Sequence, residues 1–437
     1  MMKPALTLIL SGVIGVLAAA APAHAQPRPE RPYRGLFAGG NQGLTQQVAI
    51  HASFGGGYDT NVLASENIGV GPSNTSSSRM ALGSAGASYM IGNERLTFNT
   101  SANANVQYFP VLSDPYVRRY YASATASWRV TKRTAISASE SATQDPFYSF
   151  APRVFDENVS VIIPSGDASQ TLFLDRRWSY RTSLGATHQV SQRIGLYADA
   201  DFGKSNSSVA TLRLTSRHYD AGGTARLTKN LSLRIGYALQ EARFDDDQET
   251  VRSHALDGGV NYDRSLSFSR RTKLSFGTGL AATTDGNSTR YGLTGRVQLD
   301  HEIARSWNAV GSYNRDVQFI EVFRQAVFAD QVSGSVRGLL SRRVSVYGTV
   351  GAIRGTVGLN DTDDKSYTNY QAGAGLGYGL TRLVSFSLDY TYYNYDLQGR
   401  LTLPSGFPPK AERHSIRASV NLWAPVFQRP RRPNASR

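Results

Sequence analysis

The chain has 437 residues, and its 47 lysines and arginines against 33 aspartates and glutamates give a formal net charge of +14. It contains no cysteine, which excludes a disulfide framework and a thiolate metal site. Glycine, alanine, serine, threonine, asparagine and tyrosine are plentiful and the long apolar periods of helices are missing, so the composition favours strands.

The first residues have the pattern of a secretory signal. Lys3 precedes an apolar run from Ala5 to Ala21, and Ala23-His24-Ala25 is a small-x-small cleavage site. The run is at the short end for a membrane anchor, which is the alternative. We therefore predict a signal peptide over residues 1–25, cleaved near Ala25, and a periplasmic segment over residues 26–45. No later stretch reaches the about 18 apolar residues of a membrane helix, so the exported chain is soluble or spans as strands.

A break of shared composition recurs along the rest of the chain. Most copies have an apolar residue, serine or threonine, one or two basic residues and then a new alternating run; they are GNERLTF at Gly92, VTKRTAI at Val130, VSQRIGLY at Val190, LTKNLSL at Leu227, FSRRTKLSF at Phe268, IARSWNAV at Ile303, LSRRVSVY at Leu340 and LTRLVSF at Leu380. The spacing is roughly 35 to 41 residues, with one gap of about 60, which marks a repeated unit. The unit is predicted to be a pair of strands with a tight turn at one end and a longer loop at the other.

The runs between breaks alternate in polarity. The run from Leu96 to Tyr108 places leucine, phenylalanine, alanine and valine on one face and threonine, serine and asparagine on the other. Long strands with this alternation, short turns at one end and aromatic residues near strand ends are typical of a transmembrane barrel. A soluble β-sandwich or β-propeller is the alternative.

The strand count predicts the architecture. Eight breaks join sixteen strands, and a first strand at Val48–Thr60 and a last at Ser415–Trp423 bring the total to about eighteen. The predicted fold is all-β: a transmembrane antiparallel up-and-down β-barrel over residues 46–425, with short periplasmic turns, long external loops and a basic periplasmic tail over residues 426–437. A barrel of 16 to 18 strands leaves an aqueous channel. The strand after Arg133 fits least well, because Glu140 falls on its lipid-facing side.

The polar faces of the predicted strands supply candidate pore-lining residues of both signs. They are Arg181, Arg226, Arg234, Arg296, Arg337 and Arg417, with Asp199, Asp201, Asp257, Asp263, Asp300 and Asp389. Mixed charge indicates a hydrated polar conduit and argues against a filter of a single sign. Many of these side chains could instead only solvate the wall or pair across strands.

The longest gap between breaks falls in the third predicted external loop, between Asp145 and Arg176. Loops of this length are usually functional or disordered. If the loop folds inward it would constrict the pore, with Asp156, Glu157 and Asp167 facing the arginines; the alternative is that it lies over the rim.

The excess positive charge concentrates at the predicted turns and in the tail from Arg429 to Arg437. A basic rim at the periplasmic end suits the anionic headgroups of phospholipids. The alternative is that this rim binds a periplasmic partner or an anionic polymer. Acidic loop tips at Asp245–Asp247 and Asp361–Asp364 are interpreted as solvated, with cation-bridged lipopolysaccharide as the alternative. No nucleic-acid-binding motif accompanies the charge, so no nucleic-acid partner is expected.

The sequence shows no catalytic pattern. The histidines of the mature chain are single and scattered, without metal-ligand spacing or a nucleophile elbow. His218 and Asp220, on one face of one predicted strand, are the only local pair that suits acid–base chemistry. We expect no enzyme activity, no metal and no cofactor, with an outer-membrane barrel enzyme as the least favoured alternative.

The segment GGGYDTNVL from Gly55 to Leu63, followed by about eighteen strands with turns such as LTKN and VTKR, resembles the outer-membrane β-barrel porin families of Gram-negative bacteria. In particular it resembles the family often encoded beside exopolysaccharide-export genes. The resemblance implies a hydrophilic pore in the outer membrane. Export of a surface polysaccharide is the function that it favours. The resemblance also implies contacts with outer-membrane lipid and lipopolysaccharide, the barrel-assembly machinery and a periplasmic polysaccharide-export protein. A passive diffusion porin for small solutes such as sugars is the alternative.

Overall fold

The computed structural model describes residues 35–38, 44–62, 77–112, 114–149, 171–207, 213–228, 231–244, 250–262, 271–285, 288–320, 323, 325–358, 366–398 and 410–430. No helix in these ranges is long and apolar enough to cross a membrane. The predicted signal peptide and most of the predicted periplasmic segment and basic tail lie outside them.

The described residues form strands almost throughout. In chain order these are β1 (Leu44–Asp59), β2 (Ser78–Gly92), β3 (Leu96–Tyr108), β4 (Tyr116–Arg129), β5 (Thr134–Ser149), β6 (Thr171–Gln189), β7 (Ile194–Asn206), β8 (Leu214–Arg226), β9 (Leu231–Phe244), β10 (Thr250–Tyr262), β11 (Thr272–Asp285), β12 (Ser288–His301), β13 (Asn308–Ile320), β14 (Gln325–Leu339), β15 (Val344–Val357), β16 (Ser366–Gly379), β17 (Val384–Gln398) and β18 (Lys410–Pro430).

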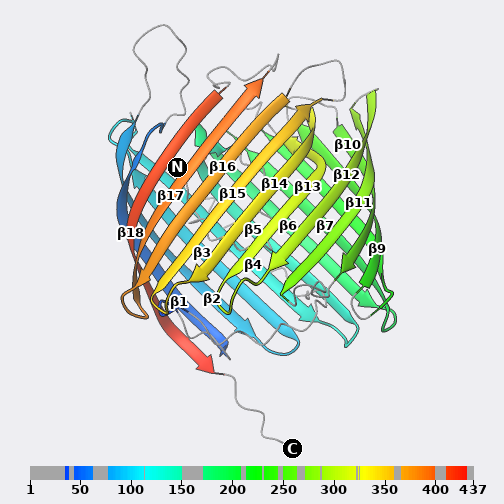
Figure 1. Ribbon diagram of the computed structural model, residues 1–437, viewed down its shortest axis with the longest axis horizontal. Coiled ribbons are helices and arrows are strands. Elements are labelled where there is room, and N and C mark those ends of the chain that lie inside the picture. Colours follow the sequence, from blue (N-terminus) through cyan, green and yellow to red (C-terminus); the bar gives the residue numbers. More distant parts are fainter. Residues whose placement is uncertain are drawn as a thin grey trace, which may run out of the picture.

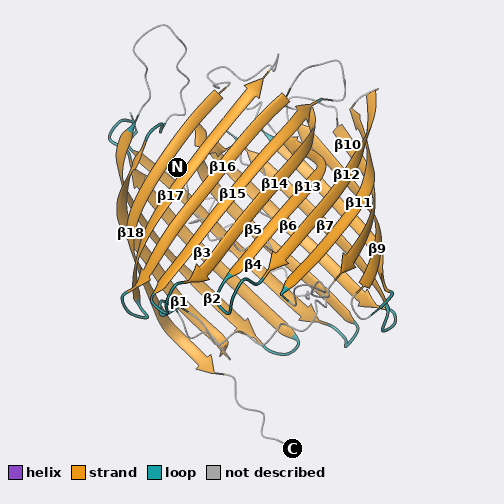
Figure 2. Cartoon of the chain, in the orientation of Figure 1, coloured by secondary structure: helices purple, strands orange, loops and turns teal. Residues whose placement is uncertain are grey.

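These strands form one closed antiparallel barrel of 18 strands (Figures 1 and 2). Each strand pairs with the next along the chain, and β1 pairs with β18 to close the ring. The predicted up-and-down barrel and its strand number are confirmed. Strand structure extends beyond the predicted limits, because β1 begins at Leu44 and β18 runs from Lys410 to Pro430.

The recurring serine or threonine organises the tight turns at one end of the barrel, called here the turn end. Ser341 Oγ accepts hydrogen bonds from the backbone N–H groups of Arg343 and Val344, at 3.2 and 3.1 Å. Thr381, Thr131 and Ser191 do the same in their own turns. A side-chain acceptor of this kind replaces the Asn-Gly or Asp-Gly turn that these sequences lack.

Connections at the opposite end, called the loop end, differ from the prediction of uniformly long loops. The connections after β11 and β13 span only residues 286–287 and 321–324. The longest spans residues 150–170. It is shorter than the predicted loop from Asp145 to Arg176, because β5 and β6 pair from Thr134↔His188 to Ser149↔Thr171. Asp156, Glu157 and Asp167 of the predicted constriction loop lie outside the described residues.

The outer face of the barrel is apolar. Large apolar side chains on alternate positions are strongly exposed there, such as Ile235 at 70%, Leu256 at 61% and Val350 at 58%. A continuous apolar surface with a polar interior is the arrangement of a barrel that faces lipid. Glu140 does lie on this outer face, where it accepts a 2.6 Å hydrogen bond from Thr182 Oγ1.

The described part of the segment before β1 lies at the turn end. Leu36 N donates to Arg342 O at 2.6 Å, and Ala38 N donates to Arg382 O at 3.0 Å. Ala38 has a φ of 51°, so the chain bends sharply there. These contacts hold residues 35–38 against the turns that precede β15 and β17.

Candidate functional site in the barrel lumen

Most of the predicted pore-lining residues lie on the inner face. Each occupies the strand positions opposite to those of the exposed apolar side chains; they are Arg181, Asp199, Asp201, Arg226, Arg234, Asp257, Arg296, Asp300, Arg337, Asp389 and Arg417. Asp263 lies outside the described residues.

Strand register brings several of these charges together. Arg181 on β6 contacts Asp201 on β7 at 3.0 Å, and Ser183 also donates to this carboxylate. Arg234 on β9 donates to Asp257 on β10, and Arg296 on β12 lies 3.6 Å from the same carboxylate. The pairs join neighbouring strands or strands one further apart, so the middle of this wall is a network of balanced charge.

A second group of predicted residues lies on the β15–β18 side of the lumen. Asp389 accepts a 2.7 Å hydrogen bond from Tyr347 Oη and stands opposite Arg417 in the β17–β18 register. Arg337 lies towards the turn end of β14, opposite Asn308. The predicted residues therefore do not converge on one point: they are spread round the inner wall.

The loop-end half of the lumen contains a feature that the sequence analysis did not predict. β13 pairs with β12 only from Ala309↔His301 to Arg315↔Gly295, whereas it pairs with β14 along its whole length, to Ile320↔Gln325. Beyond Gly295 the two strands separate. We call the described residues 316–320, 323 and 325–329 the inward hairpin, because their contacts lie inside the barrel.

One side of the inward hairpin packs against the inner face of β8–β11. Its Val317 and Ala326 join a buried apolar cluster with Leu214, Ala242, Phe244, Val251 and Ala281. On β12, a Cβ placed on Gly292 would lie 2.4 Å from the Phe328 ring, so glycine is required for this approach. Arg290 stacks over the same ring at 4.5 Å from its centroid. The hairpin is therefore a second layer behind β9–β12.

The hairpin tip also contacts the wall formed by β15–β17. The Phe323 ring centroid lies 5.3 Å from that of Tyr367 on β16, and Phe323 is buried. Tyr367, Tyr393 and Tyr395 are each only 1% exposed, although all of them occupy inner-face positions. The inward hairpin thus crosses the lumen from one wall to the other and narrows its loop-end half.

The β1–β4 side of the loop end is also filled. Val62, Met80, Phe109, Leu112 and Val117 form a separate buried apolar cluster there. At the adjacent β1–β18 junction, Asp59 and Arg413 form an ion pair at 2.7 Å, and both side chains are 1% exposed. Among the described residues, buried apolar clusters and this ion pair therefore fill much of the loop-end half of the lumen.

The sequence carries a signal for the inward hairpin that alternation alone does not reveal. From Val317 to Phe328 the chain reads VQFIEVFRQAVF, with apolar residues on both faces at the tip. Such a run is typical of a strand that is buried on both sides. Both faces are covered only because the hairpin leaves the lipid-facing wall and enters the barrel.

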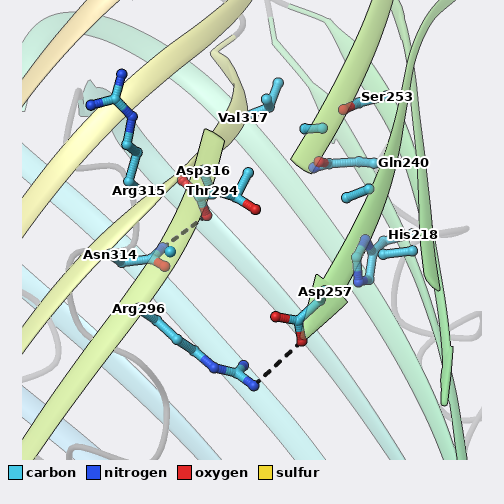
Figure 3. Close-up of a pocket in the computed structure, with 14 residues that line it drawn as sticks. His218, Gln240, Ser253, Asp257, Thr294, Arg296, Asn314, Arg315, Asp316 and Val317 are labelled. Atoms are coloured by element: carbon cyan, nitrogen blue, oxygen red, sulfur yellow. Dashed lines mark hydrogen bonds and ion pairs between the residues drawn. The ribbon is translucent and has the colours of Figure 1, made fainter. Parts of the chain in front are cut away.

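A cavity of about 180 Å³ lies where β13 parts from β12 (Figure 3). Its polar lining includes His218, Asp257, Arg296, Asn314 and Asp316, and other side chains of β9–β13 form the rest. His218 lines this cavity, whereas Asp220, the other residue of the predicted acid–base pair, stands opposite Asp199 in the β7–β8 register. No group of metal-ligating side chains occurs among the described residues.

Comparison with known proteins gives distant structural likeness only. No protein-family model matches the chain, and no curated protein matches it. Among solved structures, OccK2 (OpdF) of Pseudomonas aeruginosa in complex with glucuronate is 10% identical, with a TM-score of 0.45 over 90% of this chain and 100% of that one. OpdQ of Pseudomonas aeruginosa is 11% identical, with a TM-score of 0.43 over 87% and 98%. The FrpB iron transporter from Neisseria meningitidis is 9% identical, with a TM-score of 0.45 over 87% and 83%.

Proposed function

We propose that the protein is a hydrophilic channel of the outer membrane through which small solutes diffuse, with the inward hairpin as its constriction. The observation that carries this proposal is the division of polarity: an apolar outer face encloses an inner wall of ion pairs and hydroxyl groups in a barrel of 18 strands. Barrels of this size enclose an aqueous channel.

The inward hairpin favours small solutes over a polymer. It spans the loop-end half of the lumen, and the cavity beside it has a volume of about 180 Å³. An extended polysaccharide would need this hairpin to leave the barrel. Export of a surface polysaccharide, the function that the family resemblance favours, gains no support from the described contacts. The lipid, assembly and export partners stay predictions.

The test is single-channel conductance of the refolded protein in a planar bilayer. In one variant, residues 316–329 are replaced by Asn-Gly, which joins Arg315 to Asp330 across a pair that already stands in register. The matched control deletes Asp156 to Asp167 in the predicted third external loop. We expect a small, steady wild-type conductance that rises several-fold in the hairpin variant and changes little in the control.

Two outcomes contradict this proposal in different ways. Absence of conductance from every variant, while β-sheet circular dichroism shows folded protein, would overturn the channel. If conductance rises in the loop control but not in the hairpin variant, the protein is still a channel, but its constriction is the third loop and not the inward hairpin.

A further inference from the structure

We propose that the cavity beside the inward hairpin is a binding site for small zwitterionic solutes, which carry both an ammonium and a carboxylate group. This inference rests on the proposed channel function and names the class of solute that the constriction selects. The cavity lies where β12 and β13 part, so a solute that moves along the lumen meets it at the border of the narrowed half (Figure 3).

The anion-binding part of the site is Arg296. Asp257 has a closer partner in Arg234, which donates directly to it, whereas Arg296 lies 3.6 Å away and its side chain is 49% exposed. A guanidinium carries five N–H donors, and a single long contact uses few of them. Arg296 therefore retains donors that can hold a carboxylate in the bidentate geometry that arginine favours.

The cation-binding part of the site is Asp316. Its carboxylate accepts hydrogen bonds from Asn314 Nδ2 at 2.9 Å and Gln318 Nε2 at 3.2 Å. Both donors are neutral amides, and Asp316 has no ion-pair partner within the described part of the chain. A carboxylate that is partly withdrawn from water gains most from a cationic partner, and a ligand ammonium would supply it.

The shape and remaining lining of the cavity restrict the solute further. A volume of about 180 Å³ suits a small solute. The lining has no tyrosine, tryptophan or phenylalanine to stack on a sugar ring. Gln240, Ser253 and Thr294 also line the cavity, and their polar side chains can hydrogen-bond to a polar solute. These features fit a small amino acid better than a monosaccharide.

The test measures interruption of the single-channel current in KCl by added L-alanine. Three probes separate its charges: alaninamide keeps only the ammonium, propionate keeps only the carboxylate, and glucose has neither. We expect alanine to interrupt the current at lower concentration than any of the others. Arg296→Gln and Asp316→Asn should each weaken this effect at least about tenfold, which corresponds to the loss of one charged contact.

The matched control is Arg252→Gln, which removes a cation of the outer face that does not line the cavity. It should leave the effect of alanine unchanged. Titration of detergent-solubilised protein with alanine by calorimetry measures the same affinity without a conducting channel, so failure of the channel and failure of the site are distinguishable. Equal effects of alanine and glucose, or equal alanine affinity in wild type and both site variants, would overturn the site.

Discussion

At the scale of single residues, the loop end of the barrel contains one unusually buried ion pair. Arg413 on β18 contacts Asp59 on β1, with Nε at 2.9 Å from both carboxylate oxygens. The two residues are separated by almost the whole chain, and the pair lies beside the seam that closes the ring. A buried pair is costly to break, because removal of one partner leaves the other charge without compensation.

Replacing Arg413 by methionine should therefore destabilise the barrel by about 3–5 kcal/mol. The reason is that the Asp59 carboxylate, at a site that is 1% exposed, would lose its cationic partner. The measurement is urea unfolding of the protein refolded into lipid vesicles, followed by tryptophan fluorescence.

Lys410 provides the matched control on the same strand. It contacts Asp396 at 3.5 Å, but its side chain is 57% exposed. Lys410→Met should cost less than about 1 kcal/mol, because solvent screens an exposed pair. If both substitutions cost the same, the buried pair does not hold the seam.

At the scale of strands, the β12–β13 contact is the discontinuity in the wall. Other neighbours pair over nearly their full lengths, but β12 has no registered partner on its β13 side from Ser288 to Thr294. The contact is replaced by side-chain packing of Phe328 and Arg290. A strand edge that lacks backbone hydrogen bonds to a neighbour is less protected from amide hydrogen exchange than a strand that is hydrogen-bonded on both sides.

Amide hydrogen exchange should reveal this edge. Alternate amides of Ser288–Thr294 point away from β11, so they should exchange faster than those of Val297–His301, which have strand partners on both sides. Mass spectrometry of the detergent-solubilised protein after brief exposure to deuterated water measures the difference. Equal protection of the two segments would mean that β12 and β13 stay paired in solution beyond Gly295.

At the scale of the whole molecule, the chain has a net positive charge, but the charges on the inner face of the barrel are balanced. Inner-face arginines stand beside aspartates, as in the pairs Arg181–Asp201 and Arg296–Asp257. A conducting path with balanced charge has little preference for the sign of an ion. The excess positive charge lies elsewhere, in part at exposed turn residues such as Arg342 and Arg343.

The channel should accordingly show weak ion selectivity. In a KCl gradient the reversal potential of the wild type should lie close to zero, and Asp201→Asn should move it towards anion preference, because Arg181 loses its partner. Glu241→Gln is the control: Glu241 contacts Arg217 and Arg252 on the outer face, outside the conducting path. A strong shift from Glu241→Gln, or none from Asp201→Asn, would contradict this assignment of faces.

Local chemistry was sufficient to predict the barrel. Alternation with a period of two residues assigns a face to each side chain, and it predicts the inner-wall positions that Asp201, Asp257 and Arg296 occupy. The serine or threonine of several breaks makes its hydrogen bonds within a few residues, as Ser341 does with Val344, so local sequence also predicts these turns. Even the misfit at Glu140 was placed on the correct face.

The constriction depends on contacts that no local pattern contains. Whether VQFIEVFRQAVF lies in the wall or inside the barrel depends on how Val317 fits against Phe244 and Ala281, and on the glycine at position 292 that lets Phe328 approach. These partners come from different strands. They meet only when the strands have paired in register and the barrel has closed. The pairing of Arg296 with Asp257 on a non-adjacent strand has the same origin. Alternation therefore defined the wall, while packing across the lumen decided where it narrows and which charges line the cavity.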